Sequence, residues 1–277
     1  MNNNSKQWTP HGLIAVLHLP AMPGDPKYQN KTTREILDFA LKDAKNIVEG
    51  GINALIIENF GSAPFPKGNA AQPVPPQHIA LMAILAHELR TAYPELIIGI
   101  NCLRNDAKAA MGIAKITSAN FIRVNVLSNT YCTDQGVIEG EAYELLRFKK
   151  LLDAEKISIA ADILVKHANP LATLSPREAT KDTLDRALAN AVIVTGNGTG
   201  MPVDRKTLEE VFHAAESKPV LMGSGTKIDT LPIYAPFIQG AIVGTSLKFN
   251  AQIENHVDID RVKNLVTTFK QLVKPII

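Results

Sequence analysis

One pattern repeats along the whole chain: a short run of apolar residues, a turn, and then a longer amphipathic segment. The short runs are apolar at every position instead of alternating, which is typical of strands buried on both faces of a parallel sheet. They occupy residues 13–18, 54–58, 97–101, 121–125, 157–162, 191–195, 219–222 and 240–244. The pattern therefore predicts eight buried parallel strands.

The segments between these runs have the hydrophobic period of helices. In residues 33–50, for example, Ile36, Ala40, Ala44 and Ile47 lie on one stripe. Further helices are predicted at 77–92, 106–116, 141–154, 176–188, 204–216, 228–234 and 258–273. Eight strands alternating with eight helices favour an α/β fold with one (β/α)8 (TIM) barrel domain over residues 1–277. An open, doubly wound sheet of the same count is the alternative.

Polar residues or glycines stand at the ends of the predicted strands, whose bodies are apolar. In a barrel these carboxyl ends meet at one mouth, where active sites lie. Two long loops, 60–76 and 126–140, follow strands on the same side. A capping role can explain any one polar residue, but buried polar groups without partners are costly, so their joint occurrence predicts a binding site. The residues expected to contact substrate are Asn59, Asn101, Arg123, Asn125, Thr195 and Gly196.

Two glycine-rich turns follow the last two predicted strands. Barrels often bind phosphate in these loops, and backbone amides in a glycine turn can point at one anion. The hydroxyl of Thr226 and the charge of Lys248 would add to such a site. Glycines that merely permit tight turns are the competing interpretation. The predicted phosphate-binding residues are Gly223, Ser224, Gly225, Gly244, Thr245 and Ser246.

Candidates for proton transfer and covalent chemistry lie at the same strand ends. Glu58 and Asp162 would divide the general acid and base roles if their environments separate their pKa values. His18 and His167 are further proton carriers. Lys166 is a candidate Schiff-base nucleophile if it is desolvated, and otherwise a charge partner.

Arg123 has two interpretations of its own. It either stabilises a second anionic group of the ligand or pairs with Glu58 or Asp162. No cofactor is predicted. A divalent metal held by His18, Glu58 and Asp162 is left as an alternative, since no ligand spacing demands it.

Composition narrows the function further. The net charge is +2 and the charges are scattered, which argues against a nucleic-acid partner. Cys102 and Cys132 cannot form a disulfide framework, which fits a reducing compartment. No run of about 18 apolar residues is present to span a bilayer. We therefore predict a cytoplasmic protein and leave peripheral membrane contact open.

Short motifs along nearly the whole chain resemble those of one family, the BtpA (BtpA/SgcQ) family of the ribulose-phosphate-binding barrel type. They occur in one order around a single predicted barrel. The motifs are HLPAMPG (18–24), GGINA (50–54), ENFG (58–61), APF (63–65), LRND (103–106), FIRVN (121–125), TDQG (133–136), VKH (165–167), GSG (223–225) and IVGTSLK (242–248). The family usually has Asp after ENFG, whereas this chain has Ser62.

The residues and the resemblance together suggest three classes of function. The first is an enzyme for a phosphorylated sugar or phosphoribosyl compound, by isomerisation, retro-aldol cleavage or glycosidic bond cleavage. The second is a non-catalytic factor for biogenesis or stability of a membrane complex, because the founding member of the family is tied to photosystem I. The third is a phosphate-ligand sensor, which Ser62 favours if the missing Asp is catalytic. Barrels of this type often pair, so a homo-oligomer is expected.

Overall fold

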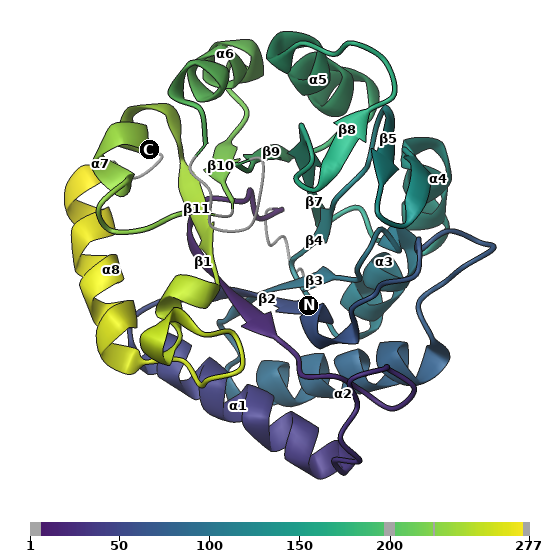
Figure 1. Ribbon diagram of the computed structural model, residues 1–277, viewed down its shortest axis with the longest axis vertical. Helices are drawn as coiled ribbons and strands as arrows, with labels where there is room; N and C mark the ends of the chain where they lie inside the picture. The colour runs from purple at the N-terminus through teal and green to yellow at the C-terminus, as the bar shows by residue number, and fades with distance from the viewer. Residues whose placement is uncertain (1–6, 197–202, 224, 274–277) are drawn as a thin grey trace, which may run out of the picture.

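The computed structural model describes residues 7–196, 203–223 and 225–273. Within them, eight parallel strands form a closed barrel in the order β1-β2-β3-β4-β7-β9-β10-β11, and β11 pairs with β1 to complete it (Figure 1). This closure confirms the predicted (β/α)8 barrel over an open sheet. The strands are β1 Gly12–His18, β2 Ala54–Glu58, β3 Ile97–Asn101, β4 Phe121–Val124, β7 Ser158–Ile163, β9 Ala191–Val194, β10 Val220–Met222 and β11 Gly240–Val243.

Helices surround the strands, and several of them begin at a capping side chain. Thr32 and Ser175 each form a capping box, with Glu35 and Glu178 respectively. The helix that begins at Pro176 changes to a π-turn over Asp182–Arg186, so the predicted 176–188 helix is irregular. The helices are α1 Thr33–Glu49, α2 Pro76–Ala92, α3 Ala107–Ile116, α4 Ala142–Leu151, α5 Pro176–Lys181, α6 Arg205–Ala215, α7 Leu231–Tyr234 and α8 Ile259–Leu272.

The barrel interior is a packed apolar core that is closed at the amino-terminal ends of the strands. Phe121 is fully buried there, and its ring occupies the space beside Gly99, where an added Cβ would lie 2.3 Å from it. The Trp8 ring packs on Phe121 with centroids 5.0 Å apart, and Ser158 donates a hydrogen bond to the Trp8 carbonyl. The base of the barrel is therefore sealed by apolar packing.

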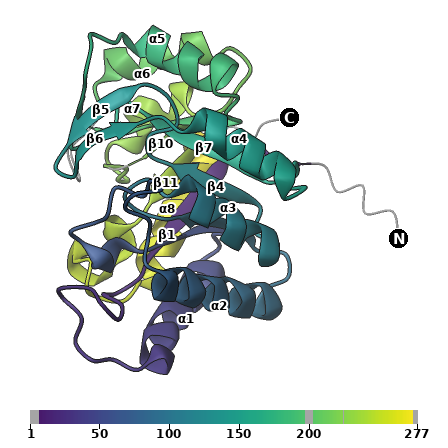
Figure 2. The same cartoon turned by 90° about the vertical axis from the view of Figure 1, so that its right-hand side faces the viewer.

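The predicted loop at 126–140 contains a hairpin that the sequence pattern did not reveal. Strand β5 Thr130–Thr133 pairs with β6 Gly136–Glu139 on one side and with β8 Ala168–Pro170 on the other, in an antiparallel sheet beside the barrel (Figure 2). Under it, Val126, Tyr131, Ile138 and Val165 form a small apolar cluster. The sheet therefore ties the loop after β4 to the loop after β7.

Candidate active site

A cavity of about 300 Å³ opens at the carboxyl ends of the barrel strands, above the apolar side chains of Val16 and Ile242. It brings together residues from both predicted sets, the proton carriers and the glycine turns. On one side it is lined by His18, Glu58, Phe60, Arg123 and Lys166, and on the other by Gly225, Thr226, Lys227, Gly244, Thr245 and Ser246. Phe60 and Lys227 are lining residues that the sequence analysis missed.

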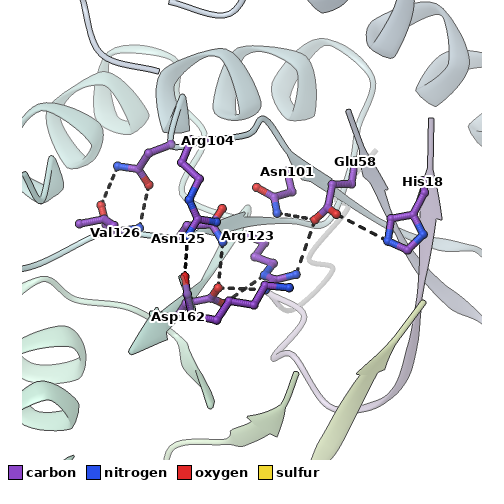
Figure 3. A network of polar contacts seen from close by, with 10 residues as sticks. His18, Glu58, Asn101, Arg104, Arg123, Asn125, Val126 and Asp162 are labelled. Atoms are coloured by element: carbon purple, nitrogen blue, oxygen red, sulfur yellow. Dashed lines mark hydrogen bonds and ion pairs between the residues drawn. The ribbon is translucent and has the colours of Figure 1, made fainter. Parts of the chain in front are cut away.

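Arg123 is the centre of a buried charge network (Figure 3). Its Nε and Nη2 donate to Asp162 Oδ1 and Oδ2 at 3.0 and 2.9 Å, and its Nη1 lies 3.6 Å from Glu58 Oε2. Burial lowers the pKa of Arg123, but the two carboxylates outweigh it and hold that pKa above its ordinary value. Arg123 therefore stays charged, and it pairs with both carboxylates at once.

The two carboxylates have different surroundings. Glu58 lines the cavity and accepts a 2.7 Å hydrogen bond from Asn101 Nδ2. Asp162 has a fully buried side chain, does not line the cavity, and accepts a further 2.9 Å bond from Asn125. Of the predicted pair, only Glu58 is placed to meet a ligand directly.

His18 lies between Glu58 and Gly244 in the cavity lining. Burial lowers its pKa from 6.5 to about 4, against the opposing effect of Glu58, so the imidazole is neutral at pH 7. Its Nε2 lies 3.7 Å from Glu58 Oε1, which is therefore not a salt bridge at neutral pH. Its ring contacts Phe60 edge-on and packs so closely on Gly244 that an added Cβ there would lie 2.4 Å from His18 Cε1. Within the described residues, its buried Nδ1 has no hydrogen-bond partner.

Lys166 reaches the cavity from the loop after β7. Burial and the nearby Arg123 lower the pKa of its amine. Its backbone carbonyl accepts a 2.8 Å hydrogen bond from Arg104 Nη2. The neighbouring His167 is exposed and does not line the cavity, so the structure does not bring it to the other proton carriers. Partial burial, Lys166 and Arg104 lower the pKa of His167.

The two glycine turns are joined to each other. Ser246 Oγ donates to the Thr226 carbonyl at 3.3 Å, and Thr226 Oγ1 donates to the Gly223 carbonyl at 2.9 Å. The hydroxyl of Thr226 thus closes its own turn. Gly223 packs against Thr195 outside the cavity lining, and Ser224 lies outside the described residues.

Lys248 corrects one expectation, because it does not add charge to the glycine turns. It is fully buried, and its Nζ bonds Asp43 Oδ2 of α1 at 2.5 Å. Asp43 Oδ1 also accepts from the Val257 amide at 3.0 Å, and the Lys248 amide donates to the Thr245 carbonyl at 3.1 Å. The pair therefore supports the turn from behind, and Lys227 is the lysine of the glycine turns that lines the cavity.

Several residues predicted to contact substrate lie outside the cavity lining. Asn59 is fully buried, and its amide bonds the backbone N–H and C=O of Leu103 at 2.7 and 3.2 Å, so it fastens a neighbouring loop instead. Asn101 donates a hydrogen bond to Glu58, and Asn125 donates one to Asp162. Thr195 and Gly196 are buried near Gly223, and Thr195 Oγ1 has no hydrogen-bond partner within the described chain.

Ser62 lies away from the cavity. It is buried, and its Oγ donates a 2.8 Å hydrogen bond to Asp25 Oδ2, while Asp25 Oδ1 lies 3.5 Å from His78 Nε2. The contacts join the loop after β1 to the loop after β2. The Asp that the resemblance implies at this position would therefore stand in this loop junction and not in the cavity lining.

The residues of the alternative metal site do not form one. Arg123 contacts both Glu58 and Asp162, which separates the carboxylate of Asp162 from His18. Across residues 7–196, 203–223 and 225–273, no group of three or more His, Cys, Asp or Glu side chains has an arrangement that could hold a metal ion. Nor does any helix there have the length and apolar character needed to cross a membrane.

Fold and site together define a (β/α)8 barrel protein with a ligand-sized, charged cavity at the carboxyl ends of its strands. The chain belongs to the BtpA family, which it matches over residues 9–271. It is 43% identical over 260 residues to an uncharacterized protein of Methanocaldococcus jannaschii, covering 94% of this chain and 95% of that one. It is 38% identical to the photosystem I biogenesis protein BtpA of Synechocystis, covering 96% and 90%.

Solved structures show the same fold at low sequence identity. The tryptophan synthase alpha chain of Legionella pneumophila superposes with a TM-score of 0.57 at 10% identity, covering 95% of this chain and 91% of that one. At this identity the likeness speaks for the barrel fold alone.

Proposed function

We propose that the protein is an enzyme that acts on a phosphorylated sugar or phosphoribosyl-type small molecule. The observation that supports this is one cavity lined both by the two glycine turns and by the ionisable side chains of His18, Glu58 and Arg123. Gly225, Gly244, Thr245, Ser246 and Lys227 would bind the phosphate through backbone amides, hydroxyls and one positive charge. The volume of about 300 Å³ is at the lower end of small-ligand pockets and suits a sugar phosphate.

Phosphate binding would place the reacting carbon against Glu58. Binding energy from the distant phosphate orients the substrate, so that the reacting carbon is held at a fixed position relative to Glu58. Glu58, held by Asn101, is the proton carrier, and Arg123 stabilises negative charge that develops on the substrate. Asp162 acts through Arg123, because its carboxylate accepts three hydrogen bonds and does not line the cavity. The neutral imidazole of His18 would form a hydrogen bond with the substrate, and its ring forms part of the cavity wall.

The proposal is tested first by measuring phosphate binding and then by measuring proton exchange between the substrate and solvent. Isothermal titration with inorganic phosphate and a panel of pentose phosphates should give saturable binding at the glycine turns. Proton exchange into D2O should follow with the correct sugar phosphate. Glu58→Gln should keep phosphate binding and lose exchange, whereas the exposed control Glu209→Gln should change neither. Absence of both phosphate binding and exchange would refute the proposal.

Two other functions give different results in the same experiments. A sensor would bind a phosphorylated ligand without exchange or turnover. A non-catalytic biogenesis factor would keep its cellular phenotype in Glu58→Gln; this alternative is suggested by the name of the Synechocystis relative, photosystem I biogenesis protein BtpA. The class of reaction and the cytoplasmic location stay predictions.

A further inference from the structure

We propose that Lys166 is a catalytic residue that forms an imine with the carbonyl group of the substrate. This rests on the function proposed above and narrows it. The substrate would be an open-chain aldose or ketose phosphate, so isomerisation and retro-aldol cleavage would be favoured over cleavage of a glycosidic bond.

The backbone around Lys166 is held in a costly conformation. Leu164 and His167, on either side of it, have φ values of 48° and 55°, in the left-handed region that non-glycine residues avoid. Such residues persist where the surrounding structure imposes them, and they cluster at functional sites. The left-handed residues on either side set the direction in which the side chain of Lys166 leaves the loop.

Two contacts impose this conformation. Val165 is buried in the apolar cluster with Val126 and Tyr131 under the β5–β6–β8 sheet. Arg104 anchors the Lys166 carbonyl at 2.8 Å. The hairpin after β4 and the loop after β3 thus both support the position from which the amine enters the cavity.

The surroundings of the amine suit a nucleophile. Lys166 lines the same cavity as Glu58, Arg123 and the two glycine turns. Burial, Arg123 and Arg104 all disfavour its ammonium form, while Glu58 and Asp162 partly oppose them. A lysine beside other cations and partly removed from water has more of the neutral amine that attacks a carbonyl.

The step balances with groups that are present. Glu58 carboxylate takes one proton from the Lys166 ammonium, and the freed nitrogen lone pair forms a C–N bond to the carbonyl carbon while the C–O π bond opens. A second proton passes from nitrogen to this oxygen, which gives a carbinolamine. Glu58 then returns its proton to the hydroxyl, which leaves as water as the C=N bond forms. The product is a protonated imine, and Glu58 is a carboxylate again.

The protonated imine draws electrons from the neighbouring carbon. It would therefore promote loss of a proton or cleavage of a C–C bond there, the steps needed for isomerisation and retro-aldol cleavage. Phosphate held at Gly244 and Thr245, in the same cavity, would fix the distance between the carbonyl and the phosphate. The cavity would thereby select the chain length of the sugar.

The test is reductive trapping. The full chain is incubated with ribulose 5-phosphate or dihydroxyacetone phosphate and sodium cyanoborohydride, and analysed by intact mass and peptide mapping. We expect a single saturable adduct on Lys166 that inorganic phosphate suppresses. Lys166→Met and Lys166→Arg should lose it, Glu58→Gln should slow it at least tenfold, and the exposed control Lys206→Met should keep it.

Phosphate binding by the same variants separates the two proposals. Lys166→Arg and Lys166→Met should bind inorganic phosphate within about twofold of the native chain, which also shows that they fold. Binding and exchange without any adduct, or an adduct spread over other lysines, would overturn the role of Lys166 and leave the proposed function standing. If the native chain shows neither phosphate binding nor exchange, both proposals are refuted.

Discussion

The buried neutral His18 makes the stability of the fold depend on pH. Its pKa is about 4 in the folded chain and 6.5 in an unfolded one. Between these values the unfolded chain binds more protons, so lowering the pH through this window favours unfolding. One pKa unit corresponds to about 1.4 kcal/mol, so His18 should remove about 2 kcal/mol of stability by pH 5 and about 3 kcal/mol by pH 4.

Urea unfolding of the native chain and of His18→Asn between pH 4 and 7 measures this contribution. Carboxylates titrate in both proteins, so their effect largely cancels in the difference between the two curves. We expect the native chain to lose about 2 kcal/mol more than His18→Asn between pH 7 and pH 5. The exposed control His87→Asn should follow the native curve.

An NMR titration of the His18 ring measures the pKa of His18 directly. Its Cε1–H resonance should not move between pH 8 and pH 5.5. A midpoint near 6.5, or a difference between native and His18→Asn stability that does not vary with pH, would refute the description of His18 as a desolvated neutral imidazole.

Three further predictions concern the turns and the charges behind them. Gly244→Ala should weaken phosphate binding at least tenfold in calorimetry, because the new Cβ would lie 2.4 Å from His18 Cε1. Lys248→Met should reduce the free energy of unfolding in urea by about 3–5 kcal/mol, since it leaves the Asp43 charge buried; adding Asp43→Leu should restore much of it. Asp162→Asn should slow exchange about tenfold or more at unchanged phosphate affinity, because Arg123 loses the carboxylate that accepts two of its hydrogen bonds.

Each of these three predictions can be refuted by a specific result. Unchanged phosphate affinity in Gly244→Ala would mean that the anion binds elsewhere. Native-like stability in Lys248→Met would mean that the Asp43 pair is not needed to hold the turn. Faster or equal exchange in Asp162→Asn would contradict a role through Arg123, and weaker phosphate binding there would place Asp162 at the phosphate.

The barrel strands and the lining of the site could be predicted from the sequence because they depend on local pattern. A strand covered on both faces is apolar throughout, so residues 54–58 and 97–101 were located at their observed bounds. The polar residue that follows such a run must face the barrel mouth. The sequence pattern therefore predicts that Glu58 and Gly244 lie at the same mouth, and both line the cavity.

The roles of individual polar residues could not be predicted in this way, because they depend on partners far along the chain. Lys248 pairs with Asp43, which lies 205 positions away in the sequence, and nothing in the sequence near Lys248 indicates that it will pair with a carboxylate. Asn59 bonds the backbone of Leu103, a contact set by the course of a neighbouring loop. The hairpin β5–β6 was missed because strands of four residues have too few positions to show alternation.

The sealed base of the barrel has a practical consequence. Trp8 is the chain's single tryptophan, and it packs on Phe121 at the end opposite the cavity. Its intrinsic fluorescence is therefore a built-in reporter of whether the barrel floor is assembled. A ligand that arrives at the far end should leave this emission unchanged, so folding and occupancy can be followed in one sample by separate signals.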